Sequence, residues 1–517
     1  MRKFILLALV MAGQSWAQQW SPAINLMPSD PGSSWAASNQ AHSLAVRGDT
    51  MYLVWYNSTV GIINMGHQIY FKKYDGVSWD AGNTLIGFTG NYRRHSWYPS
   101  CAMGPGGDLH VVWETNDFIQ TSDGASIYDI AYRRLSQGVW VPALSVNPTN
   151  VTLNAVQGYS WRPVIACGGD NIVHTAWQDN RQGTFKIFYK SLTGPSNWSD
   201  YLCLSPQGVY AGFPSIAMSG TQPAVVWQDF RDGSNQIYFK KYDGTAGWGQ
   251  DSAISHSDYG AFAPCLAGDP AGNLHAAWED ISLSDGNFEI YYRRFSAQTQ
   301  SWGNVIRLTK DPYYSRQPFL LCQSDGTVNL FWSDDRSGSY EIYHRQSVNN
   351  SWEPETTLTQ FDGLASLNPS AAGDHLGNLH LIWSDFSPSY QGSDGFYYHV
   401  PDIFYLRDTS FQMTTNKNPA VITSLSVLSL LPARPNPMRE RTQIALMTGQ
   451  RGWARVRVYN IAGQLVKELY QGELDGGRHE FEWDARDGSG VRVSNGLYLA
   501  RAESAGAAVT GKIMVVR

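Results

Sequence analysis

Three arginines stand where they could meet one anionic ligand. Arg94, Arg162 and Arg316 each begin a short strand-like segment of one internal repeat, and Tyr313-Tyr314 stand just before Arg316. A guanidinium group grips a carboxylate through two parallel hydrogen bonds, so arginines around one opening favour an acidic ligand. A tyrosine paired with a glutamate can serve as the nucleophile when such a ligand is an acidic sugar.

Carboxylates form a second candidate group. Glu114 follows Trp113 directly, and Glu279-Asp280 follow Trp278. Two carboxyl groups separated by about 5 to 9.5 Å can hydrolyse a glycosidic bond between them. The sequence does not give the separation, so glycoside hydrolysis stays an alternative and enzyme activity stays open.

The cysteines indicate packing rather than chemistry. Four of the five follow the repeat proline closely, at Cys101, Cys167, Cys265 and Cys322. We expect buried free thiols, with a Cys101–Cys167 disulfide as the alternative. No CxxC or His-rich spacing indicates a metal site, so we predict no metal and no cofactor.

These residues belong to a seven-fold repeat. Each copy has a proline, a hydrophobic run ending in Trp, polar residues and an I-Y-Y-K-R-like run. The spacings between the run-ending tryptophans are 58, 64, 50, 51, 54 and 51 residues. Several short strands per unit at this period are typical of a β-propeller, so the fold class is all-β. The tryptophans are Trp55, Trp113, Trp177, Trp227, Trp278, Trp332 and Trp383.

The first and last copies are incomplete in complementary ways. The seventh copy ends at Ile403–Asp408 without the Trp-led strand that closes most other copies, whereas an orphan strand of that kind begins at Trp20. We therefore predict that the N-terminal strand completes the seventh blade and closes the ring.

Loop lengths locate a candidate binding surface. The b-strand Trp and the c-strand Ile lie 14, 17 and 20 residues apart in blades 1, 2 and 7, against 10 to 12 elsewhere. Blades 7, 1 and 2 are neighbours in a closed ring, so their loops predict a raised wall at one mouth. We expect ligand binding by Tyr92, Arg94, His95, Trp97, Glu114, Trp161, Arg162 and Arg316. The wall also includes Trp35, Arg93, Tyr98, Asp117, Tyr159, Tyr390 and Asp394.

Repeated pairs are expected to be structural. In three copies an Asp stands two residues after the b-strand Trp, and an Arg stands two residues after that Asp. A catalytic residue is needed only once in the ring, so a pair that recurs in several blades indicates a structural role. We predict that these pairs stabilise turns and that the tryptophans before them pack the blades. The pairs are Asp179/Arg181, Asp229/Arg231 and Asp334/Arg336.

Composition and the N-terminus bear on location. The 517 residues carry a net charge of -6, so no basic surface predicts nucleic-acid binding. Residues 1–17 have Arg2-Lys3, an apolar core and Ser15-Trp16-Ala17, which predicts a signal peptide and export. No later apolar run is long enough to span a membrane, and we expect a soluble monomer once the protein is exported.

The chain is expected to have two folded domains. A propeller over 18–409 is followed by a linker over 410–431 and by a small unit over 432–517. The small unit has about six alternating short strands divided by Gly-rich turns. This pattern predicts an immunoglobulin-like sandwich.

The repeat resembles that of the sialidase-like superfamily with BNR-type repeats. Runs such as "VVWQDFRDGSNQIYF" and "LFWSDDRSGSYEIYH" carry the resemblance, with degenerate Asp-boxes at "KYDGVSW" and "KYDGTAGW". The resemblance covers about 390 residues and implies a propeller. The family's R-I-P at the first inner strand is absent here, where Asn39-Gln40-Ala41-His42 stand, so its arginine triad does not transfer.

The C-terminal unit resembles the sorting domain of type IX secretion, which is related to the Ig-like domain of hook-capping proteins. The resemblance rests on Asn436-Pro437, "VYNIAGQLV", "GGRHEFEWDARDGSG", "NGLYLARA" and "GKIMVVR". It implies a secretion machinery as partner and a secreted or cell-surface location. Together these observations predict a secreted propeller that binds an extracellular glycan or protein. A sialidase-like hydrolase and a surface scaffold without a ligand are the alternatives.

Overall fold

The computed structural model forms two compact units, residues 1–415 and 416–517. It describes residues 20–27, 33–36, 42–58, 66–87, 95–120, 126–141, 144–145, 158–194, 197–281, 286–360, 362–386, 389–391, 397–399, 401–408, 428–430, 438–448, 451–460, 463–475, 477–504 and 507–516. Every regular element in these ranges is a strand, which confirms the all-β prediction. None of the described residues forms a helix able to cross a membrane. The expected signal peptide lies outside the described residues.

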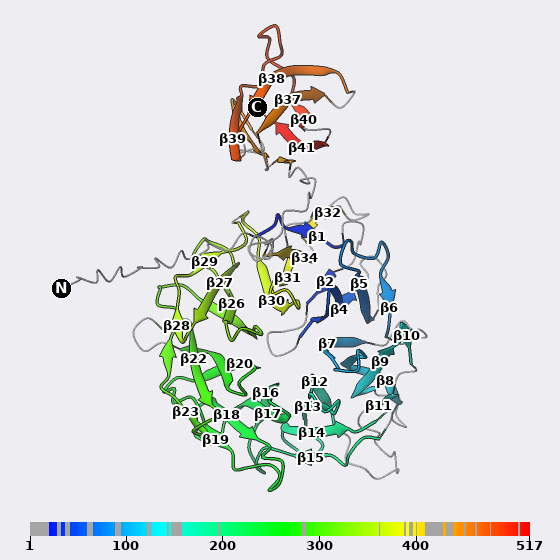
Figure 1. Ribbon diagram of the computed structural model, residues 1–517, viewed down its shortest axis with the longest axis vertical. Coiled ribbons are helices and arrows are strands. Elements are labelled where there is room, and N and C mark those ends of the chain that lie inside the picture. The colour runs from blue at the N-terminus through cyan, green and yellow to red at the C-terminus, as the bar shows by residue number, and fades with distance from the viewer. Residues whose placement is uncertain are drawn as a thin grey trace, which may run out of the picture. The chain divides into compact units, whose positions relative to one another are not determined.

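The first unit is a ring of seven antiparallel sheets, of which blades 3, 4 and 7 have four strands and blades 1, 2, 5 and 6 have five (Figure 1). Blade 1 contains β2 (Ser33–Trp35), β3 (Leu44–Arg47), β4 (Thr50–Ser58), β5 (His67–Tyr74) and β6 (Thr84–Leu85). Blade 2 contains β7 (Ser96–Met103), β8 (Leu109–Gln120), β9 (Ser126–Ser136), β10 (Val139–Trp140) and β11 (Leu144–Ser145). Blade 3 contains β12 (Ser160–Cys167), β13 (Val173–Asp179), β14 (Lys186–Leu192) and β15 (Leu202–Cys203). Blade 4 contains β16 (Ala211–Ser219), β17 (Gln222–Asp229), β18 (Gln236–Lys241) and β19 (Ser252–Ala253).

The remaining blades repeat this order. Blade 5 contains β20 (Ala261–Gly268), β21 (Leu274–Ile281), β22 (Phe288–Ser296), β23 (Ser301–Trp302) and β24 (Ile306–Arg307). Blade 6 contains β25 (Ser315–Cys322), β26 (Val328–Asp334), β27 (Glu341–Val348), β28 (Ser351–Trp352) and β29 (Thr356–Thr357). Blade 7 contains β30 (Ser366–Gly373), β31 (Leu379–Asp385) and β34 (Asp402–Arg407), with a hairpin of β32 (Ser389–Gln391) and β33 (Tyr397–His399) between β31 and β34.

The N-terminal strand closes the ring. In blade 7, β1 (Ile24–Asn25) takes the outermost place and pairs with β34, and Trp20 bridges to Asp408. Trp20 also packs edge-on against Phe331 of blade 6, with ring centroids 6.4 Å apart. The predicted closure by the orphan strand is confirmed.

Basic side chains tie blades 1, 2, 4, 5 and 6 to the blade before each of them. The Lys or Arg of the I-Y-Y-K-R run donates to the carbonyl that follows the previous blade's outer strand. Lys240 reaches Leu204 O at 3.0 Å, and Arg293 reaches Ile254 O at 3.0 Å. Lys72 makes the same bond to Leu26 O at 2.9 Å, so the pattern continues across the ring closure.

The repeated tryptophans and Asp/Arg pairs are structural, as expected. All seven b-strand tryptophans are at most 1% exposed. In blade 6, Asp334 accepts the Trp332 indole N–H at 3.0 Å and pairs with Arg336 at 2.7 Å. The Asp229/Arg231 pair repeats this arrangement. Each carboxylate thereby links the core tryptophan to its turn.

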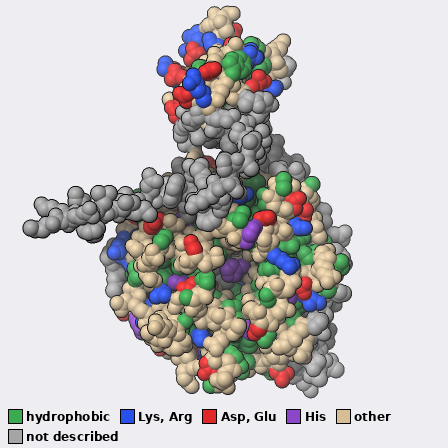
Figure 2. Space-filling model, in the orientation of Figure 1, with side chains coloured by type: hydrophobic (Ala, Val, Ile, Leu, Met, Phe, Trp, Pro, Cys, Tyr) green, Lys and Arg blue, Asp and Glu red, His purple; other side chains and the backbone are tan. Residues whose placement is uncertain are grey.

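The innermost strands line an apolar channel. Cys101, Cys167, Cys265 and Cys322 lie on these strands as free thiols, and Cys203 on β15 is also free. A cavity of about 300 Å³ at one end of the channel is lined mainly by Ala, Leu, Val, Ile and Met. The Cys101–Cys167 disulfide is therefore not formed. On the face of the propeller that Figure 2 shows, the coloured acidic, basic and apolar side chains are mixed, without a block of one sign.

The second unit is a two-sheet sandwich. One sheet contains β35 (Leu428–Leu430), β36 (Thr442–Thr448) and β39 (Gly477–Trp483). The other contains β38 (Leu465–Leu474), β37 (Gly452–Asn460), β40 (Gly496–Ser504) and β41 (Ala507–Val515). Trp483 is buried in its core. The first strand of this unit, β35, lies inside the segment expected to be a linker, because its backbone pairs with β36.

Candidate functional site

A bulge in the innermost strand recurs in six blades. The residue before the repeat proline has a positive φ of 46° to 56°, and the pairing register shifts there. A non-glycine residue in this left-handed region costs about 1–2 kcal/mol, so neighbouring groups must hold it. The bulge residues are Tyr98, Arg162, Phe213, Ala263, Gln317 and Asn368.

The preceding blade supplies an acceptor that stabilises the bulge. In blades 2, 3 and 5, the side chain directly after the b-strand Trp accepts the next bulge residue's backbone N–H. Glu114 accepts from Arg162 at 2.9 Å, Gln178 from Phe213 at 2.9 Å, and Glu279 from Gln317 at 2.8 Å. Glu114 and Glu279 are thus equivalent supports three blades apart, each largely committed to a bulge.

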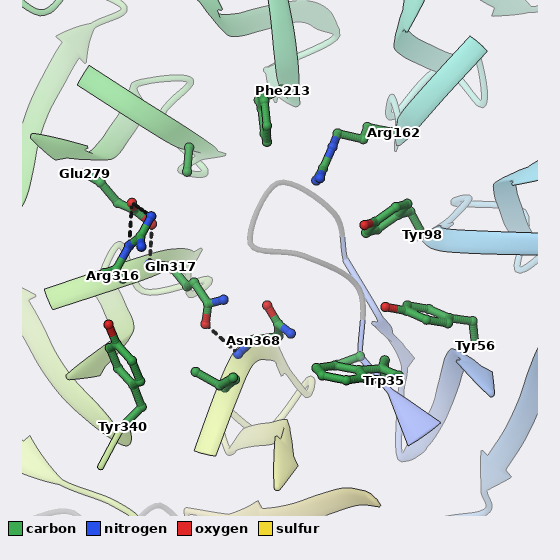
Figure 3. Close-up of a pocket in the computed structure, with 13 residues that line it drawn as sticks. Trp35, Tyr56, Tyr98, Arg162, Phe213, Glu279, Arg316, Gln317, Tyr340 and Asn368 are labelled. Carbon is green, nitrogen blue, oxygen red and sulfur yellow. Dashed lines mark hydrogen bonds and ion pairs between the residues drawn. The ribbon is translucent and has the colours of Figure 1, made fainter. Parts of the chain in front are cut away.

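The bulge side chains line a cavity of about 440 Å³ at one mouth (Figure 3). The blades run clockwise in Figure 1 and counterclockwise in Figure 3, so Figure 3 looks into the opposite face of the ring. Trp35, Tyr56, Glu279, Arg316, Tyr340, Ala36 and Leu367 complete the lining. The cavity is therefore built by side chains from every blade.

Arg162 is the cation available to a ligand. Its guanidinium lies between two aromatic rings, 4.6 Å from the Tyr98 centroid and 4.4 Å from the Phe213 centroid. Among the described residues, no carboxylate lies within 4 Å of this guanidinium. The rings orient the guanidinium by cation–π contact without neutralising its charge.

The opposite wall carries a neutralised pair. Arg316 Nη2 lies 3.0 Å from Glu279 Oε2, and the Arg316 guanidinium also lies 4.4 Å from the Phe288 centroid. Burial raises the pKa of Glu279, although Arg316 opposes the shift. Burial also raises the pKa of Tyr340. The Tyr340 hydroxyl is therefore protonated at neutral pH and can donate a hydrogen bond.

Glu114 lies beneath the bulge of Arg162 and is buried. Burial raises the pKa of Glu114 to about 7, against the opposing effects of the Arg162 N–H and guanidinium. Glu114 therefore titrates near neutral pH, close to the Arg162 guanidinium.

The aromatic residues of the predicted wall stack on one another. His95 lies 5.0 Å from Trp97, and Tyr128 lies 5.4 Å from the same ring, both stacked. Trp161 stacks on Phe185 at 4.8 Å. The Trp97 indole is therefore stacked on two neighbouring rings, and it does not line the cavity described above.

We expect Trp97→Ala to destabilise the propeller by about 3 kcal/mol, since it removes a half-buried ring that stacks on two neighbours. Urea unfolding followed by near-UV circular dichroism measures this loss. Trp97→Phe should recover most of the stability. A Trp97→Ala protein with unchanged unfolding but lost ligand binding would contradict the packing role.

The structure brings only part of the predicted site together. Arg162 and Arg316 line the cavity, and Glu114 supports Arg162. His95, Trp97 and Trp161 belong to the neighbouring aromatic stack. Tyr92, Arg93, Arg94 and Asp394 lie outside the described residues, and the side chains of Asp117 and Tyr390 are not described.

Sequence reasoning did not single out several lining residues. Tyr56, Phe213, Gln317, Tyr340 and Asn368 line the cavity without having been expected there. A signal was available for three of them, because Phe213, Gln317 and Asn368 directly precede the repeat proline. Tyr56 follows a b-strand Trp, the position that supplies the acceptors in blades 2, 3 and 5.

The C-terminal unit matches a known family model. Residues 442–508 match the model described as the FlgD Ig-like domain. The match supports the immunoglobulin-like fold of this unit. No curated protein matches the chain.

Solved structures resemble the chain in fold. An ulvan lyase of polysaccharide lyase family PL25, bound to GlcA(1-4)Rha3S, is 10% identical, with a TM-score of 0.51 over 74% of this chain and 95% of that chain. The intramolecular trans-sialidase from Ruminococcus gnavus is 10% identical, with a TM-score of 0.40 over 72% of this chain and 96% of that chain. PorZ, a surface component of the type IX secretion system of Porphyromonas gingivalis, is 17% identical, with a TM-score of 0.40 over 93% of this chain and 60% of that chain.

Proposed function

We propose that the propeller binds an anionic saccharide in the mouth lined by the bulge residues. Arg162 carries the proposal, because its guanidinium is oriented by Tyr98 and Phe213 and has no carboxylate within 4 Å among the described residues. A cation held in this way at a cavity wall favours a carboxylate or sulfate group. The binding position that we propose is therefore the central mouth.

The aromatic lining favours a sugar over a free inorganic anion. Among the described residues, Trp35 has one ring partner, Phe386, which it meets edge-on at 5.3 Å. Trp35 also lines the cavity, where an indole can stack on a sugar ring. The ulvan lyase of similar fold was solved with GlcA(1-4)Rha3S, and saccharide binding in this propeller is consistent with that structure.

Binding without hydrolysis is favoured over the glycosidase alternative. Glu114 and Glu279 each accept a bulge N–H, and Glu279 is also paired with Arg316. Glu279 lines the cavity and Glu114 does not, so the two carboxylates do not flank a bond of a ligand held there. We keep the scaffold alternative as the outcome expected if no saccharide binds.

A glycan array probed with the full mature chain tests the proposal. We expect binding to uronate-, sialate- or sulfate-bearing glycans and none to neutral glycans. Binding should weaken as salt rises, because the main contact is ionic. Binding confined to neutral glycans, or to none, would reject it.

Glu114 should make binding pH-dependent. A bound anion favours protonated Glu114, so binding takes up a proton and affinity should rise about three- to tenfold as the pH falls from 8 to 6. Glu114→Gln keeps the acceptor for the Arg162 N–H and removes the charge. This variant should bind at pH 8 as tightly as the wild type does at pH 6. Calorimetry with a sulfated ligand measures this, since a sulfate does not titrate in that range; a flat wild-type profile would contradict it.

We further propose that the C-terminal sandwich directs export and surface attachment. The proposal rests on the expected signal peptide and on the sorting-domain resemblance of this unit. Expression of the full chain in a bacterium with type IX secretion, with and without residues 428–517, tests it. Periplasmic retention of the truncated protein alone would support the role, and identical locations would reject it.

A further inference from the structure

The cavity wall opposite Arg162 presents an amide whose orientation is fixed. Ser333 Oγ donates to Gln317 Oε1 at 3.1 Å, and the Asn368 backbone N–H reaches the same oxygen at 3.0 Å. A backbone N–H can only donate, so the amide oxygen must occupy that position. The Gln317 NH₂ group is the remaining end of the amide, and it has no partner among the described residues.

Arg316 pairs with Glu279 on one side and is exposed on the other. Its Nε and Nη2 atoms lie 3.1 and 3.0 Å from Glu279 Oε2, while Glu279 Oε1 accepts the Gln317 backbone N–H. The Glu279 side chain is 2% exposed and the Arg316 side chain is 43% exposed. A ligand therefore meets guanidinium N–H groups and not the carboxylate behind them.

This wall is rich in donors and offers no free carboxylate oxygen. The other polar groups of the cavity on this side are the Tyr340 hydroxyl and the Asn368 amide, and each can donate as well as accept. A sugar hydroxyl would satisfy one donor and leave others unpaired. A sulfate or carboxylate has only acceptor oxygens and can satisfy several donors at once.

We propose that Arg316 and Gln317 form a second oxyanion subsite, so the ligand is a saccharide with two anionic groups, one at Arg162 and one at the opposite wall. This rests on the proposed function, because it assumes that a saccharide occupies the cavity. A volume of about 440 Å³ lies within the range of small-molecule sites and accommodates a short saccharide rather than an isolated ion.

Gln317→Glu tests the subsite with a near-isosteric change. The carboxylate still accepts from Ser333 and Asn368, and only the cavity-facing NH₂ group becomes an oxygen. The probes are three oligosaccharides on one backbone, carrying uronate alone, sulfate alone or both. We expect the wild type to bind the doubly charged probe at least tenfold more tightly than either single one. The variant should lose that advantage and keep its affinity for the singly charged probes within about twofold.

Gln207→Glu is the matched control, because Gln207 is exposed and does not line the cavity, and it adds the same charge. Thermal unfolding confirms that both variants fold. Equal wild-type affinity for one and two anionic groups, or equal effects of the two substitutions, would overturn the subsite while leaving anionic binding intact. If no charged probe binds the wild type, the proposed function itself fails.

Discussion

Replacing Arg162 by glutamine is expected to weaken binding of an anionic saccharide by about 100-fold. The substitution removes the cavity cation without an ionic partner and leaves the ligand's anionic group facing aromatic rings. Losing one partner of a buried charge pair costs about 2–5 kcal/mol, which corresponds to roughly 30- to 4000-fold in affinity. Isothermal titration with the best glycan from the array measures the change.

Arg162→Lys separates charge from shape. Lysine retains the positive charge but lacks the planar fork that stacks between Tyr98 and Phe213 and binds an anion through two bonds. We expect an intermediate affinity, about tenfold below the wild type. If Arg162→Gln binds as the wild type does while remaining folded, the ligand is not held at this arginine and the proposed site is wrong.

Removing the closing strand should have the largest effect on stability. A chain that starts at residue 28 lacks β1, the Trp20 packing and the Leu26 carbonyl that Lys72 uses. Leu26 and Met27 are at most 5% exposed, so their loss removes core as well as pairing. The expected cost is on the order of 5–10 kcal/mol, comparable with the whole stability of a domain.

The control is a chain that starts at residue 20 and retains the strand. We expect the shorter chain to unfold more than 10 °C lower or to aggregate through the exposed edge of β34. Calorimetry of both proteins in the same buffer makes the comparison. Restoration by a synthetic peptide of residues 20–27 would show that pairing is the cause. Equal unfolding temperatures would mean that the ring is stable without closure.

The propeller was predictable because its determinants repeat. Seven buried tryptophans at a 50- to 64-residue period mark the blades. The last blade lacks an outer strand, and an orphan strand of that kind begins at Trp20. The pairing of the two was predictable because the edge strand of a blade in a ring needs a partner. The three Asp/Arg pairs were assigned to turns by the same logic of repetition, and the structure places them there.

The site was less predictable than the fold. The lengths of the loops indicate where the backbone protrudes from the ring, but they do not indicate where side chains from different blades meet. Trp97 and Trp161 lie in the expected region, but their rings stack on neighbouring rings. Phe213 and Gln317 reach the cavity through a left-handed bulge, and alternation within a strand does not reveal that conformation. A comparison of the residues that directly precede each repeat proline would have identified both of them as candidate cavity residues.

The bulges have a consequence for how such a mouth could change. At Arg162, Phe213 and Gln317 the bulge is held by the residue's own backbone N–H and by an acceptor on the preceding blade, so the displayed side chain is not needed for that bond. Gln317 has a second role, because its side-chain oxygen accepts the Asn368 N–H of the next blade. Identity at these positions is therefore largely separable from folding, as the range from Ala263 to Arg162 illustrates. The mouth is therefore a set of positions that can be varied independently. A combinatorial library over Tyr98, Phe213, Ala263 and Asn368 should yield many folded proteins with new selectivities.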